Sequence, residues 1–131
     1  MKDYLNSLND FTKGIELQPE NGYFHFRYAI TNFALNNNQK YKESIQAAIK
    51  LFESKDENEK DWEDKLMQAL CYLANNEFEK ARKLYEEAIQ QCSEKDVIEY
   101  GLEILQESVE LIGNSPEVKN IEDLLKTALS K

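Results

Sequence analysis

The segment EFEKARKLYEEAI, residues 77–89, carries small and aromatic residues at steps that a helix brings onto one face. Its key positions follow at intervals of three, four and three residues: Phe78, Ala81, Tyr85 and Ala88. A small residue at a helix crossing lets two backbones approach closely, and a large ring beside it fills the space where the helices diverge. The segment therefore predicts a helix packed closely against others.

The same spacing recurs along the chain. Moving back 37 residues gives Tyr41, Ser44, Ala48 and Leu51, and a further 37 gives Tyr4, Ser7, Phe11 and Gly14. A second register has a small residue in its middle place: Tyr28-Ala29 with Asn32, Gln68-Ala69 with Tyr72, and Tyr100-Gly101 with Ile104. A packing problem that repeats in this way predicts a helical repeat.

Apolar periodicity and stop signals divide the chain into about seven helices, and no alternating strand pattern is present. The predicted helices cover residues 3–17, 23–35, 41–52, 62–74, 78–91 and 97–112, with a seventh after Ser115. Ser115 is the predicted N-cap of the last helix with Pro116 in its first turn, and Ser93 or Asp96 is expected to cap the helix before it. The polar stretch 53–61, ESKDENEKD, is predicted to be a charged linker. The chain is thus predicted to be all-α, with neighbouring helices antiparallel.

These residues resemble the tetratricopeptide repeat (TPR), whose second helix carries an aromatic, a small residue, an aromatic and an alanine at these steps. Residues 78–88 are the best match, and GIELQPENG, residues 14–22, is similar to a repeat junction, with Pro19 in the closing place. The resemblance implies a TPR-like α-solenoid of antiparallel helix pairs, a single domain over residues 1–131. Its parts would be a leading helix 3–17, repeats 22–53 and 60–92, and a degenerate C-terminal pair 95–130. The family period is about 34 residues, so an unrelated helical bundle is the alternative.

The resemblance also implies where a partner would bind, because the first helices of successive TPR units line a concave groove. The expected partner-binding residues are Phe26, Ile30, Phe33, Leu66, Leu70, Leu73 and Arg27. The apolar ones follow i, i+4, i+7 spacing, which is compatible with an apolar groove or with core. The implied function is a protein–protein interaction module, an adaptor, scaffold or chaperone-like protein that binds a peptide or helix of a partner. The alternative is a homo-oligomeric structural protein whose apolar wall forms a dimer interface.

Charge and residue content narrow the functional classes. A formal net charge of −9 disfavours nucleic acid and anionic membranes as ligands and favours a basic or apolar-helical partner. With one histidine, His25, and acidic residues interleaved with lysines, we expect no enzyme activity, no metal site and no cofactor. Cys71 and Cys92 are expected to be buried free thiols, with a disulfide or redox pair as the alternative. Neither a signal peptide nor a membrane span is visible, so a cytoplasmic location is expected.

Overall fold

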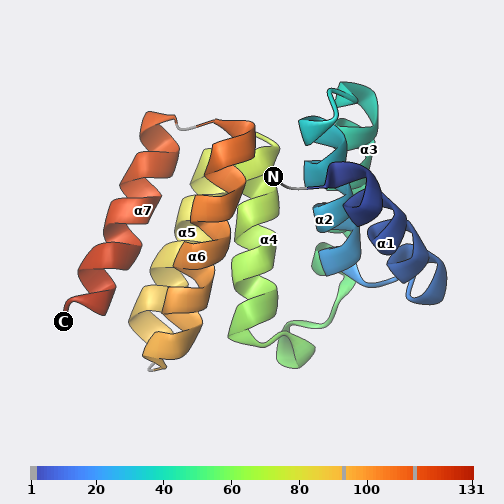
Figure 1. The fold of residues 1–131 in the computed structure, drawn as a ribbon. Coiled ribbons are helices and arrows are strands. Elements are labelled where there is room, and N and C mark those ends of the chain that lie inside the picture. Colours follow the sequence, from blue (N-terminus) through green and yellow to red (C-terminus); the bar gives the residue numbers. More distant parts are fainter. Residues whose placement is uncertain (1–2, 93, 114) are drawn as a thin grey trace. The chain divides into compact units, whose positions relative to one another are not determined.

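The computed structural model describes residues 3–92, 94–113 and 115–131, and in these ranges it contains seven α-helices and no strand (Figure 1). The helices are α1 (Tyr4–Leu17), α2 (Gly22–Ala34), α3 (Asn38–Ser54), α4 (Trp62–Ala74), α5 (Phe78–Gln91), α6 (Lys95–Ile112) and α7 (Pro116–Leu129), with a short 3-10 helix, η1 (Glu57–Glu59), before α4. The predicted all-α chain of about seven helices is confirmed. The bounds of α4 and α5 agree with the predicted ones, whereas α3 begins three residues earlier because the turn before it is tight.

Side-chain caps satisfy the first backbone N–H groups of several helices. The capping residues whose side chains accept these bonds are Asp3 for α1, Asn21 for α2, Asn37 for α3, Asp61 for α4 and Ser115 for α7. The predicted cap Ser115, followed by Pro116, is confirmed. Helix α6 instead begins after Glu94, which makes no side-chain cap bond, and Asp96 lies within its first turn. Ser93 lies outside the described residues.

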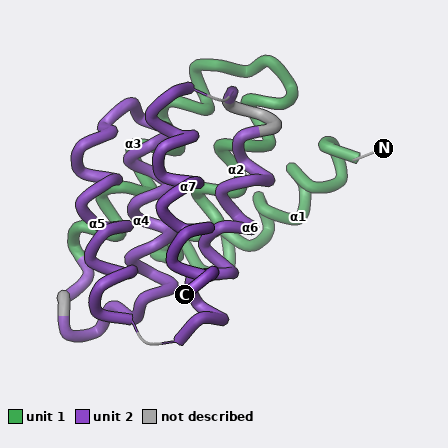
Figure 2. The backbone as a smooth tube through the Cα atoms, turned by 90° about the vertical axis from the view of Figure 1, so that its left-hand side faces the viewer, with its two compact units in different colours: residues 1–54 green, residues 55–131 purple. Residues whose placement is uncertain are grey.

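The chain forms two compact units, a first unit of residues 1–54 and a second unit of residues 55–131 (Figure 2). In the first unit, α1 and α3 both pack against α2. In the second unit, α4 packs against α5 and α6 against α7, while α4 also contacts α6 and α5 also contacts α7. In the second unit, therefore, α4 lies beside α6 and α5 lies beside α7. The single repeat domain over residues 1–131 stays a prediction.

Two asparagines close the α2–α3 and α4–α5 hairpins with the same turn. Asn36 and Asn76 have φ angles of 65° and 62°, in the left-handed region that asparagine enters more readily than most residues. Each turn returns two backbone bonds to the end of the helix before it, which is the Schellman motif. These bonds are Asn36 N to Phe33 O (3.0 Å), Asn37 N to Asn32 O (2.8 Å), Asn76 N to Leu73 O (3.1 Å) and Glu77 N to Tyr72 O (2.8 Å).

The two hairpins repeat at 40 residues, since α2 and α4 begin at 22 and 62 and α3 and α5 begin at 38 and 78. The structure therefore aligns the second helices at 40 residues rather than at the 37 of the sequence pattern. At this offset Ile45 matches Tyr85 and Ala48 matches Ala88, and all four side chains are at most 1% exposed. The two offsets differ by almost one helical turn, so both superimpose one apolar stripe on another. The turn geometry selects between them.

Small residues occupy the buried helix contacts, as the sequence pattern predicts. Five alanines have no exposed surface: Ala29, Ala48, Ala69, Ala81 and Ala88. Two glycines serve the same purpose. A Cβ atom added at Gly22 would lie 2.8 Å from the Phe52 ring, and one at Gly101 would lie 3.0 Å from Leu66 Cδ1. Close approach at these points requires the side chain to be absent or minimal.

Asn76 offers a direct test of the turn. Replacing it with alanine should lower the free energy of unfolding by about 1 kcal/mol, because a left-handed backbone is costly for a residue with Cβ and no local polar group. Glycine at the same position should leave stability unchanged or slightly higher. Urea denaturation followed by circular dichroism measures both, with Asn58→Ala, outside the left-handed region, as the control. Equal losses for alanine and glycine would show that the Asn76 side chain, and not its backbone angle, stabilises the turn.

The burial of Tyr85 predicts that the free energy of unfolding falls at alkaline pH. Burial raises the pKa of its phenol above the ordinary value near 10. Above about pH 10 the unfolded chain releases this proton while the folded chain keeps it, so the free energy of unfolding falls as pH rises. Tyr85→Phe should flatten this decline in urea titrations between pH 8 and pH 11. An unchanged decline would assign it to other groups.

Candidate functional site

Five of the seven residues that the sequence analysis assigned to partner binding are buried. Their exposed fractions are 5% or less: Phe26, Ile30, Leu66, Leu70 and Leu73. The sixth apolar residue, Phe33, is half-buried, and its ring centroid lies 4.9 Å from that of Tyr41 on α3. Their apolar spacing is compatible with either a groove or the core, and the five buried side chains lie in the core.

Arg27, the seventh predicted residue, is engaged within the first unit. It is half-buried, and its guanidinium carbon lies 5.7 Å from the ring centroid of Phe11 and 5.9 Å from that of Tyr23. A guanidinium near aromatic rings at these distances is held by cation–π attraction. Since Phe11 belongs to α1 and Arg27 to α2, this contact helps to fasten the leading helix.

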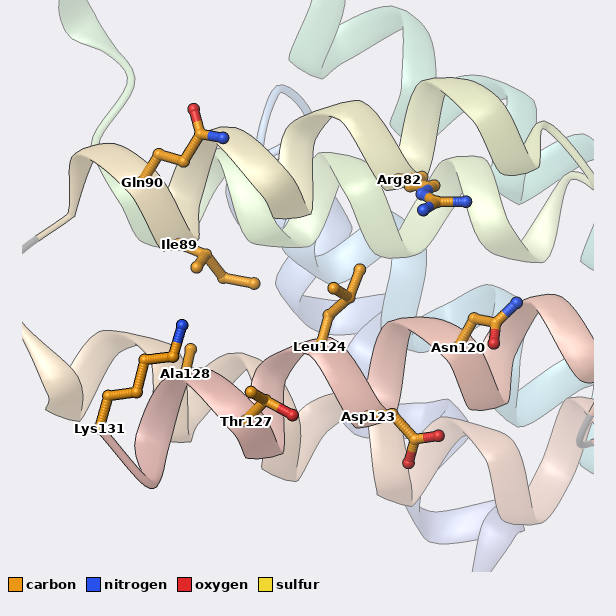
Figure 3. Close-up of a pocket in the computed structure, with 9 residues that line it drawn as sticks. All are labelled: Arg82, Ile89, Gln90, Asn120, Asp123, Leu124, Thr127, Ala128 and Lys131. Carbon is orange, nitrogen blue, oxygen red and sulfur yellow. The ribbon is translucent and has the colours of Figure 1, made fainter.

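The second unit has an open groove between α5 and α7 (Figure 3). Its volume is about 660 Å³, which lies within the usual range for ligand pockets. Ile89 from α5 and Leu124 from α7 point into it, and Ala128 extends this apolar strip by one helical turn. The polar side chains around the strip are Arg82, Gln90, Asn120, Asp123, Thr127 and Lys131.

The groove exists because the apolar stripe of α7 is wider than the part that the core covers. The covered part comprises Val118, Ile121 and Leu125, which are buried. Leu124 and Ala128 lie beside this part and are only half-buried. On α5, Ile89 follows the fully buried Ala88 and is half-buried in the same way. The groove therefore joins the uncovered edges of two amphipathic helices.

The groove differs in charge from the unit around it. Residues 55–131 contain 19 acidic and 10 basic residues, whereas residues 1–54 contain six of each. The groove lining has two cations, Arg82 and Lys131, against one carboxylate, Asp123. Arg82 Nε donates to Glu86 Oε1 at 2.8 Å, but exposed pairs of this kind contribute little to stability. The groove lining thus carries both signs of charge on a unit that is otherwise acidic.

The groove offers contacts for binding. Apolar side chains lie at its centre, and amide, hydroxyl and charged groups surround them. No group of three or more His, Cys, Asp or Glu side chains suited to a metal ion occurs in residues 3–92, 94–113 and 115–131. The hydrogen bond from Asn75, together with Lys80, lowers the pKa of Glu77. Glu77 lies just before α5 and is not part of the groove lining.

Comparison with protein-family models, curated proteins and solved structures gives no match. Within the part of the chain that the structure describes, none of the helices combines the length and apolarity needed to cross a membrane. The sequence analysis does not predict the groove residues, because the resemblance implies a site on the first helices. A signal was present in α7, where Leu124 and Ala128 add to the stripe of Val118, Ile121 and Leu125.

The two cysteines should differ in reactivity. Both are free, as expected, but only Cys71 is buried, and burial raises the pKa of its thiol. With Ellman's reagent at pH 8, we expect one thiol to react quickly in the folded protein and the second to react only after unfolding. Cys92→Ser should abolish the fast reaction, and Cys71→Ser should preserve it. Two fast thiols in the folded protein would contradict the burial of Cys71.

Proposed function

We propose that this chain is a protein–protein interaction module that holds a peptide or helix of a partner, as an adaptor, scaffold or chaperone-like protein does. The observation that carries the proposal is the α5–α7 groove, where Ile89, Leu124 and Ala128 form an open apolar strip. Contiguous apolar surface with a polar rim commonly marks a contact with another protein. Full burial of a leucine or isoleucine contributes about 1.5–3 kcal/mol, so completing the burial of two such residues supplies useful affinity.

The repeated hairpins support a TPR-like α-solenoid as the fold of this module. The α2–α3 and α4–α5 hairpins share their turn and their 40-residue step. In the second unit, the α4–α5 hairpin packs on α6–α7, first helix on first and second on second. Stacking of this kind lets each unit bury the face that it cannot bury alone. In this proposal residues 22–53 and 60–92 are repeats and residues 95–130 are the degenerate closing pair.

We place the partner on the α5–α7 groove rather than on the predicted inner face. A side chain that is already buried, such as Phe26 or Leu70, has little apolar area left to offer a ligand. The acidic surroundings favour a partner with basic flanks and disfavour nucleic acid and anionic membranes. We propose a cytoplasmic setting, where free thiols such as Cys71 and Cys92 persist.

A peptide selection tests this proposal. Peptides from a random phage-displayed library are selected on the whole chain and synthesised, and their affinity is measured by fluorescence anisotropy. Leu124→Asp should weaken their binding by about tenfold or more, because it places a charge in the apolar strip. Ala128→Glu provides a second variant at a half-buried position in case the first one unfolds. The matched control is Leu17→Asp, at a leucine that is 82% exposed and lies outside the groove.

The outcomes separate the candidates. Loss of binding in both groove variants, with helicity and the Leu17→Asp affinity preserved, supports the module. Equal binding by all variants would place the site elsewhere. A dimer in light scattering that disappears with Leu124→Asp would instead favour a homo-oligomeric structural protein whose apolar groove is the interface.

A further inference from the structure

We propose a second binding site, in the groove between α1 and α3, that takes a lysine or arginine side chain from a basic protein segment. This groove lies in the first unit and has a volume of about 370 Å³. Helices α1 and α3 both pack on α2, which contributes Tyr28 to the lining between them. The site is separate from the α5–α7 groove and does not depend on the function proposed for it.

Two carboxylates give the α1–α3 groove its charge. Glu16 comes from α1 and Glu43 from α3, and both side chains are exposed. Among the described residues neither forms an ion pair, although Lys13 and Lys40 lie three residues before them on the same helices. Glu43 Oε1 accepts a hydrogen bond of 3.2 Å from the neutral Gln39 amide, which leaves its charge uncompensated. Two such carboxylates in the lining of one groove favour a cation within it.

The rest of the lining suits the stem of a long basic side chain. Ile15 and Ala47 are apolar, and Tyr28 adds an aromatic ring. Lysine and arginine lay their methylene groups along such surfaces while the charged end stays near water, and an aromatic ring adds cation–π attraction. Two other lining groups are already engaged, since Thr12 Oγ1 donates to Leu8 O at 2.7 Å and His25 Nε2 lies 2.9 Å from Pro19 O.

The volume of the groove and its small number of possible metal ligands favour a single basic side chain over other cations. The volume is at the lower end of the range for ligand pockets, which fits a side chain better than a whole helix. A metal ion is a poorer candidate, because no cluster of three metal-ligating side chains occurs in the described ranges. The occupant that combines positive charge with apolar length is a lysine or arginine of a protein segment.

The test uses the blocked tripeptide acetyl-Gly-Arg-Gly-amide as the probe, titrated into the ¹⁵N-labelled whole chain at pH 7.5 and followed by NMR. The matched peptide carries citrulline, which keeps the shape of arginine and removes its charge. Shifts are expected at the groove residues of α1, α2 and α3 with the arginine peptide and not with citrulline. The double variant Glu16→Gln/Glu43→Gln should weaken binding about fivefold, because exposed carboxylate contacts each contribute modestly.

The control is Asp10→Asn/Glu20→Gln, which removes the same charge from exposed positions outside the groove and should leave the affinity unchanged. Equal weakening by this control would overturn the site in favour of general attraction to an acidic protein. Equal binding of the citrulline peptide would also overturn it, since the carboxylates would then be irrelevant. Leu124→Asp, in the other groove, should retain arginine-peptide binding, so failure of the α5–α7 site and failure of this one are distinguishable.

Discussion

The left-handed asparagines Asn36 and Asn76 are the constraint on which the α2–α3 and α4–α5 hairpins depend. One residue in this conformation lets the chain reverse while the last carbonyl groups of the preceding helix keep hydrogen-bond partners. It also fixes how the second helix is rotated about its own axis. One additional residue in either turn would rotate α3 or α5 by about 100°. Ile45 or Tyr85 would then leave the core, so the buried contacts of each hairpin follow from its turn.

Much of this architecture could be predicted from the sequence because helix periodicity and helix ends are local signals. Apolar spacing together with the Asn, Gly and Pro stops predicted seven helices, and small residues marked the close contacts at Ala81 and Ala88. The repeat register was less accessible, since offsets of 37 and 40 residues superimpose the same kind of stripe. Turn geometry distinguishes them, and it depends on a backbone angle that composition does not specify.

Periodicity alone also does not predict whether an apolar helix face is covered by other helices or left open. Phe26 and Leu124 both belong to apolar stripes at helical spacing, yet the first is buried and the second lines a groove. The difference lies in what packs against each helix, which is a tertiary property. Helix α2 contacts both α1 and α3, and Phe26 is fully buried. Helix α7 also has two neighbours, α5 and α6, but its buried residues are Val118, Ile121 and Leu125, and Leu124 at the edge of the stripe stays half-buried.

The polar composition of residues 53–61 likewise does not reveal which of their side chains are buried. The sequence predicts a charged linker here, but Lys60 is only 7% exposed. Its Nζ donates to Gln68 Oε1 at 3.1 Å, and Gln68 Nε2 donates to the Tyr72 hydroxyl at 3.0 Å. A lysine can cover apolar surface with its stem when its ammonium finds an acceptor, and that acceptor lies eight residues away.

The two grooves that we propose as binding sites lie in different units. One is lined by α1, α2 and α3, and the other by α5 and α7. Their linings differ, because Glu16 and Glu43 line the first, whereas the second combines Arg82 and Lys131 with Asp123. A basic side chain complements the charge of the first groove, whereas the mixed charges of the second leave apolar contact as its main contribution. A partner that occupied both grooves would need two chemically distinct segments, a basic side chain for the first and an apolar strip for the second.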